Sequence, residues 1–188
     1  MTGYYGAGRL DKVVQVLELQ ETSHGILEWV PVRTIYAAVE FSQKKNLFST
    51  VGIGARDVSL VVWRRAISLH NAIQMGNDFL FLTGITDRNR NQLNIKAALC
   101  SLVTCQADMD LEPHGIVFPG VLTEKYVGHD QPDFHSEVTT TYVLVTPKSV
   151  ELRPGSWLVA GGKYYLVLTP HLLDPYRNEF EIRRKEDC

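Results

Sequence analysis

The chain has 188 residues, of which 45% are hydrophobic and 21% are charged, a composition typical of a globular protein that buries a core. Its formal net charge of -2 argues against a protein that grips nucleic-acid phosphates, because such proteins are strongly basic. No apolar run approaches the roughly 20 residues that cross a bilayer, and Met1 to Arg9 lacks the apolar core of a signal peptide. We therefore expect a soluble, non-secreted protein with no membrane partner.

Runs of β-branched and aromatic residues recur along the chain and predict strands. In chain order they are Val13 to Leu19, Ile26 to Val39, Val58 to Trp63, Phe79 to Leu82, Tyr142 to Val145, Trp157 to Val159 and Tyr164 to Leu168. The turn signals between them are Gly76-Asn77-Asp78, Pro154-Gly155, Gly161-Gly162 and Asp174-Pro175. Leu93 to Val103 allows a short helix, but we favour a strand through Lys96. The pattern predicts an all-β, mostly antiparallel protein.

The two halves of the chain share blocks of sequence in the same order. Asp87 to Lys96 recurs in spacing and chemistry as Asp174 to Arg183, and Gly76 with its following apolar run recurs as Gly161 with its own. The shorter His24-Gly25-Ile26-Leu27 resembles His114-Gly115-Ile116-Val117. Matched blocks in conserved order indicate tandem copies of one β unit.

Each repeated block predicts a hairpin: a strand, a polar Asp/Arg/Asn loop and a second strand with one solvent-exposed face. A hairpin of this kind cannot stand alone, and a small barrel would remove its exposed edges. We predict two tandem small antiparallel β-barrel or sandwich domains, residues 8–105 and 110–185. The polar stretch Gln106 to Pro113 is the expected linker, with the boundary near residue 105.

Several segments of the first half resemble the head-closure (head–tail joining, neck) protein family of tailed bacteriophages. In order they are Gly8 to Val16, His24-Gly25, Glu28-Trp29, Ile35 to Glu40, Val61 to Arg65 and Gly76 to Lys96. The resemblance covers most of residues 8–98 and derives its specificity from the order of short motifs. The second half, as a partial copy over residues 114–184, fits well only over the closing hairpin, Pro154 to Arg184.

The resemblance implies a structural virion protein that forms a homo-oligomeric ring in the phage neck, assembled in the bacterial host cytoplasm. Its partners would be the portal and adaptor proteins and the tail terminator or tail tube proteins. Packaged double-stranded DNA would pass through the channel without sequence-specific binding. Because each chain has two similar halves, we predict a hexamer that presents twelve barrels. The alternatives are a tail-completion or tail-terminator protein, and a small β-barrel enzyme or nucleic-acid binder.

Two polar segments are candidate interface or channel loops. Phe41 to Asp57 contains Lys44, Lys45 and Arg56, and Gly128 to Ser136 contains His129, Asp130, Asp133 and His135. Each could instead be a solvated loop, and the second set could in principle bind a divalent metal. The basic terminal residues Arg183, Arg184 and Lys185 are candidate contacts to an adjoining ring.

No motif anchors catalysis, cofactor binding or a metal site. The chain has no Gly-x-Ser-x-Gly elbow, and Gly52-x-Gly54 is too short to cradle a phosphate. Cys100, Cys105 and Cys188 lack disulfide or zinc spacing, so we expect reduced thiols. The three tryptophans, Trp29, Trp63 and Trp157, are expected in the core rather than stacked on bases. We therefore predict a protein that is not an enzyme and uses no cofactor.

Overall fold

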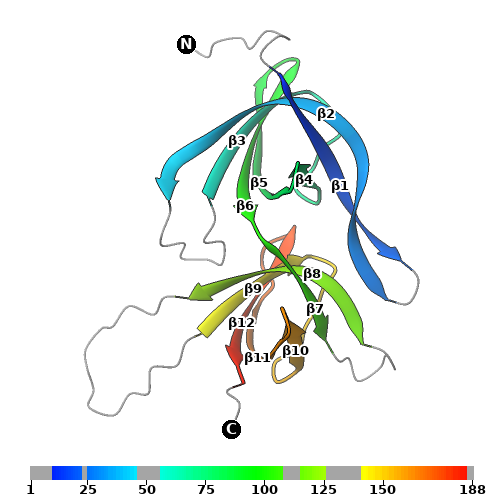
Figure 1. Cartoon of the computed structure of the whole chain (residues 1–188), viewed down its shortest axis with the longest axis vertical. Helices are drawn as coiled ribbons and strands as arrows, with labels where there is room; N and C mark the ends of the chain where they lie inside the picture. The colour runs from blue at the N-terminus through cyan, green and yellow to red at the C-terminus, as the bar shows by residue number, and fades with distance from the viewer. Residues whose placement is uncertain (1–9, 23–24, 46–55, 108–114, 126–140, 186–188) are drawn as a thin grey trace. The chain divides into compact units, whose positions relative to one another are not determined.

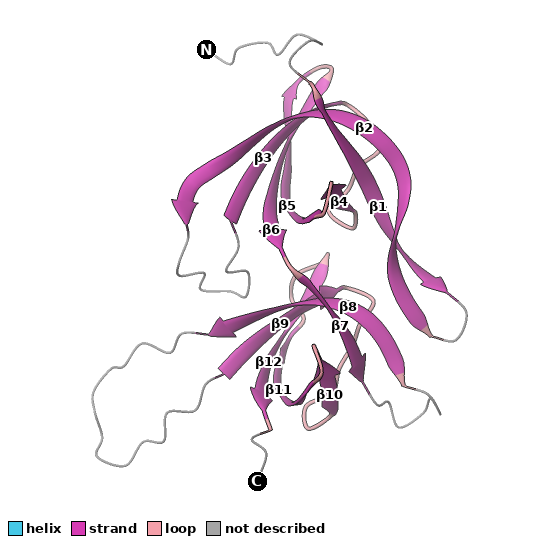
Figure 2. Cartoon of the chain, in the orientation of Figure 1, coloured by secondary structure: helices cyan, strands magenta, loops and turns pink. Residues whose placement is uncertain are grey.

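The computed structural model describes residues 10–22, 25–45, 56–107, 115–125 and 141–185, without the side chains of residues 42–45, 124–125 and 141. Within these ranges the chain forms strands joined by turns, with no helix, and this confirms the predicted all-β class (Figure 2). The strands are β1 (Lys12–Thr22), β2 (Ile26–Lys45), β3 (Arg56–Trp63), β4 (Ala72–Met75), β5 (Asp78–Asn89), β6 (Gln92–Cys100), β7 (Leu102–Ala107), β8 (Ile116–Lys125), β9 (Thr141–Pro147), β10 (Trp157–Ala160), β11 (Lys163–His171) and β12 (Arg177–Arg184). None of the described residues belongs to a helix that could span a bilayer.

The chain divides into two compact units (Figure 1). The first contains β1 to β6, except for Thr22–Leu27 at the β1–β2 turn, which is grouped with the second unit; the second also contains β7 to β12. The division falls between Ser101 and Leu102, before the predicted boundary near residue 105. The predicted linker was wrong at its start, because Gln106 and Ala107 belong to β7 of the second unit.

Both units have the same strand topology. In the first, hydrogen-bonded neighbours follow the order β1-β4-β5-β6-β3-β2, and a further pairing of β1 with β2 closes the ring. In the second, the order is β7-β10-β11-β12-β9-β8, and β8 pairs with β7 to close the ring. The equivalence extends over all six strands of each unit, well beyond the closing hairpins where the sequences are most alike.

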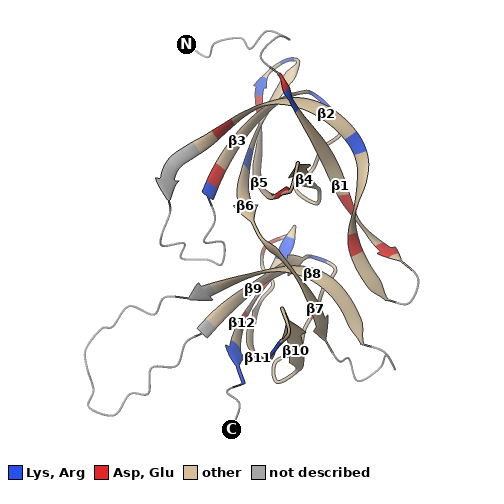
Figure 3. Cartoon of the chain, viewed as in Figure 1, with Lys and Arg blue, Asp and Glu red and all other residues tan. Residues whose placement is uncertain are grey.

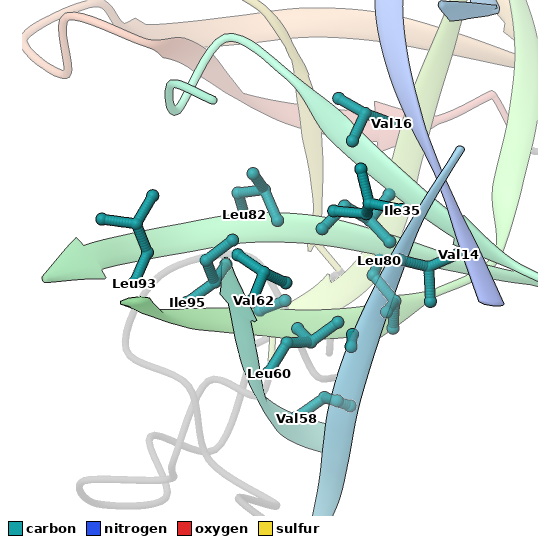
Figure 4. Packing of buried hydrophobic residues seen from close by; sticks show 13 residues of the cluster. Val14, Val16, Ile35, Val58, Leu60, Val62, Leu80, Leu82, Leu93 and Ile95 are labelled. Atoms are coloured by element: carbon teal, nitrogen blue, oxygen red, sulfur yellow. The ribbon is translucent and has the colours of Figure 1, made fainter. Parts of the chain in front are cut away.

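The core of the first unit lies inside its ring of strands. Alternate residues of each strand point inward, as the period of two requires. In Figure 4 the inward side chains of β3 and β6 lie side by side. The buried residues labelled there are Val14, Val16, Ile35, Val58, Leu60, Val62, Leu80, Leu82, Leu93 and Ile95. Because one register shift would move each set outward, this core also fixes the register.

The second unit has a separate core with the same construction. Its fully buried large side chains include Phe118 on β8, Leu144 on β9, Leu158 on β10, and Phe180 and Ile182 on β12. Cys105 and Ala107 point inward from β7 between them. Burial raises the pKa of the Cys105 thiol to about 12 and that of Cys100, in the first unit, to about 11, and both are free cysteines. Neither of these two thiols forms a disulfide with a described residue; Cys188 lies outside the described residues, and the expectation of reduced thiols stays a prediction.

Equivalent hairpins in the two units turn on glycines. Gly76, with φ of 60°, starts the two-residue β4–β5 turn; Gly161 and Gly162, with φ of 55° and 78°, form the β10–β11 turn. Two successive residues with positive φ are the signature of a tight hairpin whose twist matches its strands. The His-Gly match also has a backbone cause, because Gly25 and Gly115 have φ of 71° and 66°.

The closing hairpins differ in their loops. Asp87 was predicted in a loop but lies in β5, where it pairs with Leu93, and only Arg90 and Asn91 connect β5 to β6. Its counterpart Asp174 does lie in a loop, residues 172–176, between β11 and β12. The first unit thus closes with a tight polar turn and the second with a longer connection.

Gly120→Ala is expected to destabilise the second unit by about 1–3 kcal/mol, because the added methyl overpacks its core. A Cβ on Gly120 would lie 2.8 Å from Leu144 Cδ1 and 3.0 Å from Cys105 Sγ, both in fully buried residues. Gly84→Ala is the matched control, since its nearest neighbour would be Lys96 Cβ at 3.7 Å. Denaturant unfolding of both variants measures the difference; equal stabilities would contradict the tight approach at Gly120.

Candidate functional site

A groove of about 520 Å³ lies on the first unit, across the outer side of β2 and β3. Its lining residues are Leu10, Arg33, Thr34, Ile35, Tyr36, Trp63 and Arg65. Leu10 covers the outward-facing Ala38 and Val61, and Trp63 packs against the same small cluster. The groove therefore has an apolar floor, while the Tyr36 side chain, 60% exposed, stands in solvent.

Two arginines give the groove a positive charge. Arg33 and Arg65 are both exposed, and neither guanidinium has an ion-pair partner among the described residues. The neighbouring Arg64 differs, because its Nη2 lies 2.7 Å from Asp87 Oδ1 and its Nε donates to Arg90 O at 3.1 Å. The two arginines that follow β3 thus differ in role: Arg64 ties the end of β3 to the β5–β6 turn, and Arg65 lines the groove.

The second unit presents an apolar loop, which we define as Leu172–Tyr176. Leu173 is 101% exposed, Leu172 is 43% exposed and Tyr176 is 39% exposed. Lys148 Nζ donates to Leu172 O at 2.8 Å, and Asp174 Oδ1 accepts from the Tyr176 and Arg177 backbone N at 2.8 and 3.3 Å. The loop is therefore fixed at both ends while its leucines remain in water.

The buried side-chain amide of Asn178 is linked to this loop through Lys148. Asn178, 1% exposed, donates from Nδ2 to Lys148 O at 3.1 Å and to Val150 O at 2.7 Å, and accepts from Lys148 Nζ at 2.9 Å. Asn178 therefore ties β12 to the turn that follows β9, and the same lysine ties that turn to the apolar loop.

Glu179, beside this amide, is buried, and its pKa is raised. The largest cause is burial, which penalises the carboxylate, and attraction to Arg177, whose Nε lies 3.4 Å from Glu179 Oε1, offsets it only in part. A raised pKa in the folded state means that stability falls as pH rises above the ordinary value of 4.5, since the unfolded chain releases the proton more readily. The charged form thus costs stability at neutral pH.

Glu179→Gln is therefore expected to increase stability at pH 7, with the gain disappearing below pH 4.5, where the carboxyl is protonated in both states. The matched block of the first unit already has the buried Gln92 at this position. Unfolding measured at pH 4 and pH 7 tests this, with the exposed Glu151→Gln as control. A less stable Glu179→Gln at pH 7 would show that the Arg177 pair outweighs the cost of burial.

The predicted loop Phe41 to Asp57 is shorter than expected. β2 continues through Lys44 and Lys45, and Arg56 already begins β3, where its backbone pairs with Lys45. Residues 46–55 lie outside the described residues, as do His129, Asp130, Asp133 and His135. The two segments connect equivalent strands, β2 to β3 and β8 to β9. Within the described ranges, no group of histidines, cysteines and carboxylates has an arrangement that could hold a metal.

The basic terminal residues lie on or beside β12. Arg183 and Arg184 pair with Leu166 and Tyr165 of β11 and are exposed. Lys185 Nζ lies 5.5 Å from the ring centroid of Trp157. The core prediction was wrong for Trp157, which is 44% exposed; Trp29 and Trp63 are half-buried, and Trp29 lies 5.9 Å from the Phe79 ring.

Comparisons of the chain with protein-family models, curated proteins and solved structures found no match. The groove and the apolar loop are the two features that the sequence reading missed. One signal for the groove was available, because Thr34 and Tyr36 alternate with the buried Ile35 and Ala37 and so had to face outward. The loop had a signal too, in two leucines placed directly before the Asp174-Pro175 turn.

Proposed function

We propose that this chain is a structural component of a tailed-phage neck, forming a ring that joins the DNA-filled head to the tail and helps retain the genome. The observation that carries the proposal is the order of the family-like segments on the first unit. Val13 to Val16 lies in β1, Ile35 to Glu40 in β2 and Val61 to Trp63 in β3, and Gly76 to Lys96 runs from the β4–β5 turn into β6. These motifs thus follow one another along one closed ring of strands, with Glu28-Trp29 also in β2 and Gly76 to Lys96 spanning β5 and the start of β6.

The charge distribution is consistent with a neck protein that contacts DNA without binding it tightly. In the first unit Lys and Arg are spread over several strands with Asp and Glu among them, whereas in the described strands of the second unit they lie on β11 and β12, and β12 also contains Glu (Figure 3). A net charge of -2 differs from the strongly basic balance of proteins that neutralise many phosphates. A channel wall of this kind would let a duplex slide.

The proposal is tested in the phage that carries the gene. Deleting the gene is expected to give filled heads that lose DNA, together with unattached tails, in electron micrographs. Adding the purified chain should restore DNA retention and tail joining. Binding to purified tails, with no binding to filled heads, would instead indicate a tail-completion protein. Intact, infectious particles without the gene product would end the proposal.

The duplication bears on ring order. Because each chain supplies two units of one topology, six chains would present twelve units, and such a ring could meet both a twelve-fold portal and a six-fold tail. Native mass spectrometry of the assembled neck counts the copies, and a ring of another order would reject this part of the proposal while leaving the neck role intact.

A further inference from the structure

The apolar loop is not required by the fold that presents it. The equivalent connection in the first unit consists of Arg90 and Asn91, two polar residues that close the same hairpin of the same ring. The second unit instead has a five-residue connection, Leu172–Tyr176, with a fully exposed leucine near its centre. A longer, apolar connection in place of a tight polar one points to a role outside the unit.

The conformation of the loop suits it to bind a surface. Lys148 Nζ holds the Leu172 carbonyl, and the Asp174 carboxylate caps the backbone that follows. Pro175 further limits the backbone. A loop that is already ordered loses little conformational entropy on binding, so its leucines can contribute most of their burial energy to an interface.

The groove on the first unit has the complementary properties. Its floor is apolar, and its volume of about 520 Å³ falls within the usual size range of ligand-binding pockets. Tyr36, Trp63, Arg33 and Arg65 are of the residue types that dominate binding energy at protein interfaces. The two guanidiniums would face the one carboxylate of the loop, Asp174, which is 35% exposed and already has one cationic neighbour, Arg177 Nε, 3.3 Å from its Oδ2.

We propose that copies of this chain associate head-to-tail, with the apolar loop of one copy seated in the groove of the next. Leu172 and Leu173 would contact Leu10, Tyr36 and Trp63, and Asp174 would approach Arg33 and Arg65. Because loop and groove are different surfaces, the contact is heterologous, and repeated heterologous contacts form a ring when the rotation between neighbours closes. This inference deepens the proposed neck role, on which it rests, by naming the contact that builds the ring.

Two single substitutions in the full chain test the contact. Leu173→Asp places a charge on the loop, and Tyr36→Asp places one at the groove; each is expected to weaken self-association at least about 30-fold, as loss of an interface hot spot does. Tyr164→Asp is the matched control, because Tyr164 and Tyr36 are both 60% exposed and Tyr164 lies on β11, outside loop and groove. Sedimentation velocity and native mass spectrometry report the oligomers, and circular dichroism verifies folding.

Mixing the two variants gives the sharper result. The loop of Tyr36→Asp is intact and so is the groove of Leu173→Asp, so the mixture should form a one-to-one heterodimer and stop there. A reciprocal two-fold exchange of loops would also favour the mixed pair, but its wild-type chain would stop at a dimer, whereas repeated head-to-tail contacts give larger wild-type oligomers. Assembly of either variant like the control, a mixture that stays monomeric, or a wild-type chain that stays monomeric at the highest concentration reached would each overturn the inference.

The outcome is separable from that for the proposed function. If the deletion phage shows the neck defect while Leu173→Asp still assembles, the contact is wrong and the neck role stands. If the deletion has no effect on particles while the heterodimer forms, the contact stands and the neck role fails. Salt-sensitive binding of a single-stranded oligonucleotide that Tyr36→Asp abolishes would assign the groove to nucleic acid and reject the second copy as its occupant.

Discussion

Phe180→Ala is expected to lower the free energy of unfolding of the second unit by about 3–5 kcal/mol, because it empties the centre of that unit's core. Phe180 is fully buried, and its partner on β9 is the fully buried Leu144. The surrounding side chains come from strands held in a closed ring, which limits how far they can collapse into the cavity. Hydrogen exchange resolved by unit is the appropriate measurement, since a chain of two units need not unfold in one step.

Two control variants distinguish the loss of core packing from the effect of substitution as such. Phe180→Leu introduces the residue type that the first unit has at the matched position, Leu93, and is expected to cost clearly less. Tyr164→Ala, at a side chain that is 60% exposed, should change stability by no more than about 0.5 kcal/mol. A loss at Phe180→Ala no larger than at Tyr164→Ala would contradict a packed core there.

The strands that the sequence predicted contain runs of β-branched, aliphatic and aromatic residues, and this holds even for the four-residue β10. In β3, Val58, Leu60 and Val62 point inward and Ser59 is half-buried between them, a contrast visible without any tertiary information. The repeat added further constraint, because Gly76 and Gly161 mark equivalent turns. Local signals of this kind are sufficient for the fold class.

Three strands escaped prediction because their signals are weak or misleading. β4 has only four residues. β7 turns the small Cys105 and Ala107 inward and the polar Gln106 outward, so it looked like the start of a linker. β8 contains Pro119-Gly120, a pair that normally argues against a strand; the close approach of Leu144 explains the glycine, but only the tertiary structure reveals that approach.

The candidate surfaces were harder to predict than the fold because they depend on tertiary position. The groove combines Leu10 with residues of β2 and with Trp63 and Arg65, and no local pattern joins these. For Trp157 the local pattern was misleading. Its strand is apolar, so the residue was predicted in the core, but its side chain faces outward from β10 beside Lys185. The expected functions of the loops around residues 46–55 and 128–136 remain predictions.

Asn178→Ala is expected to destabilise the second unit on the order of 2–4 kcal/mol, because it removes a donor from one buried and one partly buried carbonyl. The Asn178 Nδ2 donates to Lys148 O at 3.1 Å and to Val150 O at 2.7 Å. The substitution also removes the Oδ1 acceptor of Lys148 Nζ. Denaturant unfolding gives the magnitude, and hydrogen exchange should show the loss in β9 and β12 first.

Lys148→Met is the partner variant that identifies the cause. It keeps both Asn178 bonds to the carbonyls but removes the donor to Asn178 Oδ1 and to Leu172 O, so the expected loss is smaller, about 1 kcal/mol. If Lys148→Met loses as much stability as Asn178→Ala, the contacts of the Lys148 ammonium, and not the Asn178 bonds to the two carbonyls, account for the loss. Because the same Nζ fixes the apolar loop, Lys148→Met should also weaken self-association, even though Lys148 itself lies outside the proposed contact.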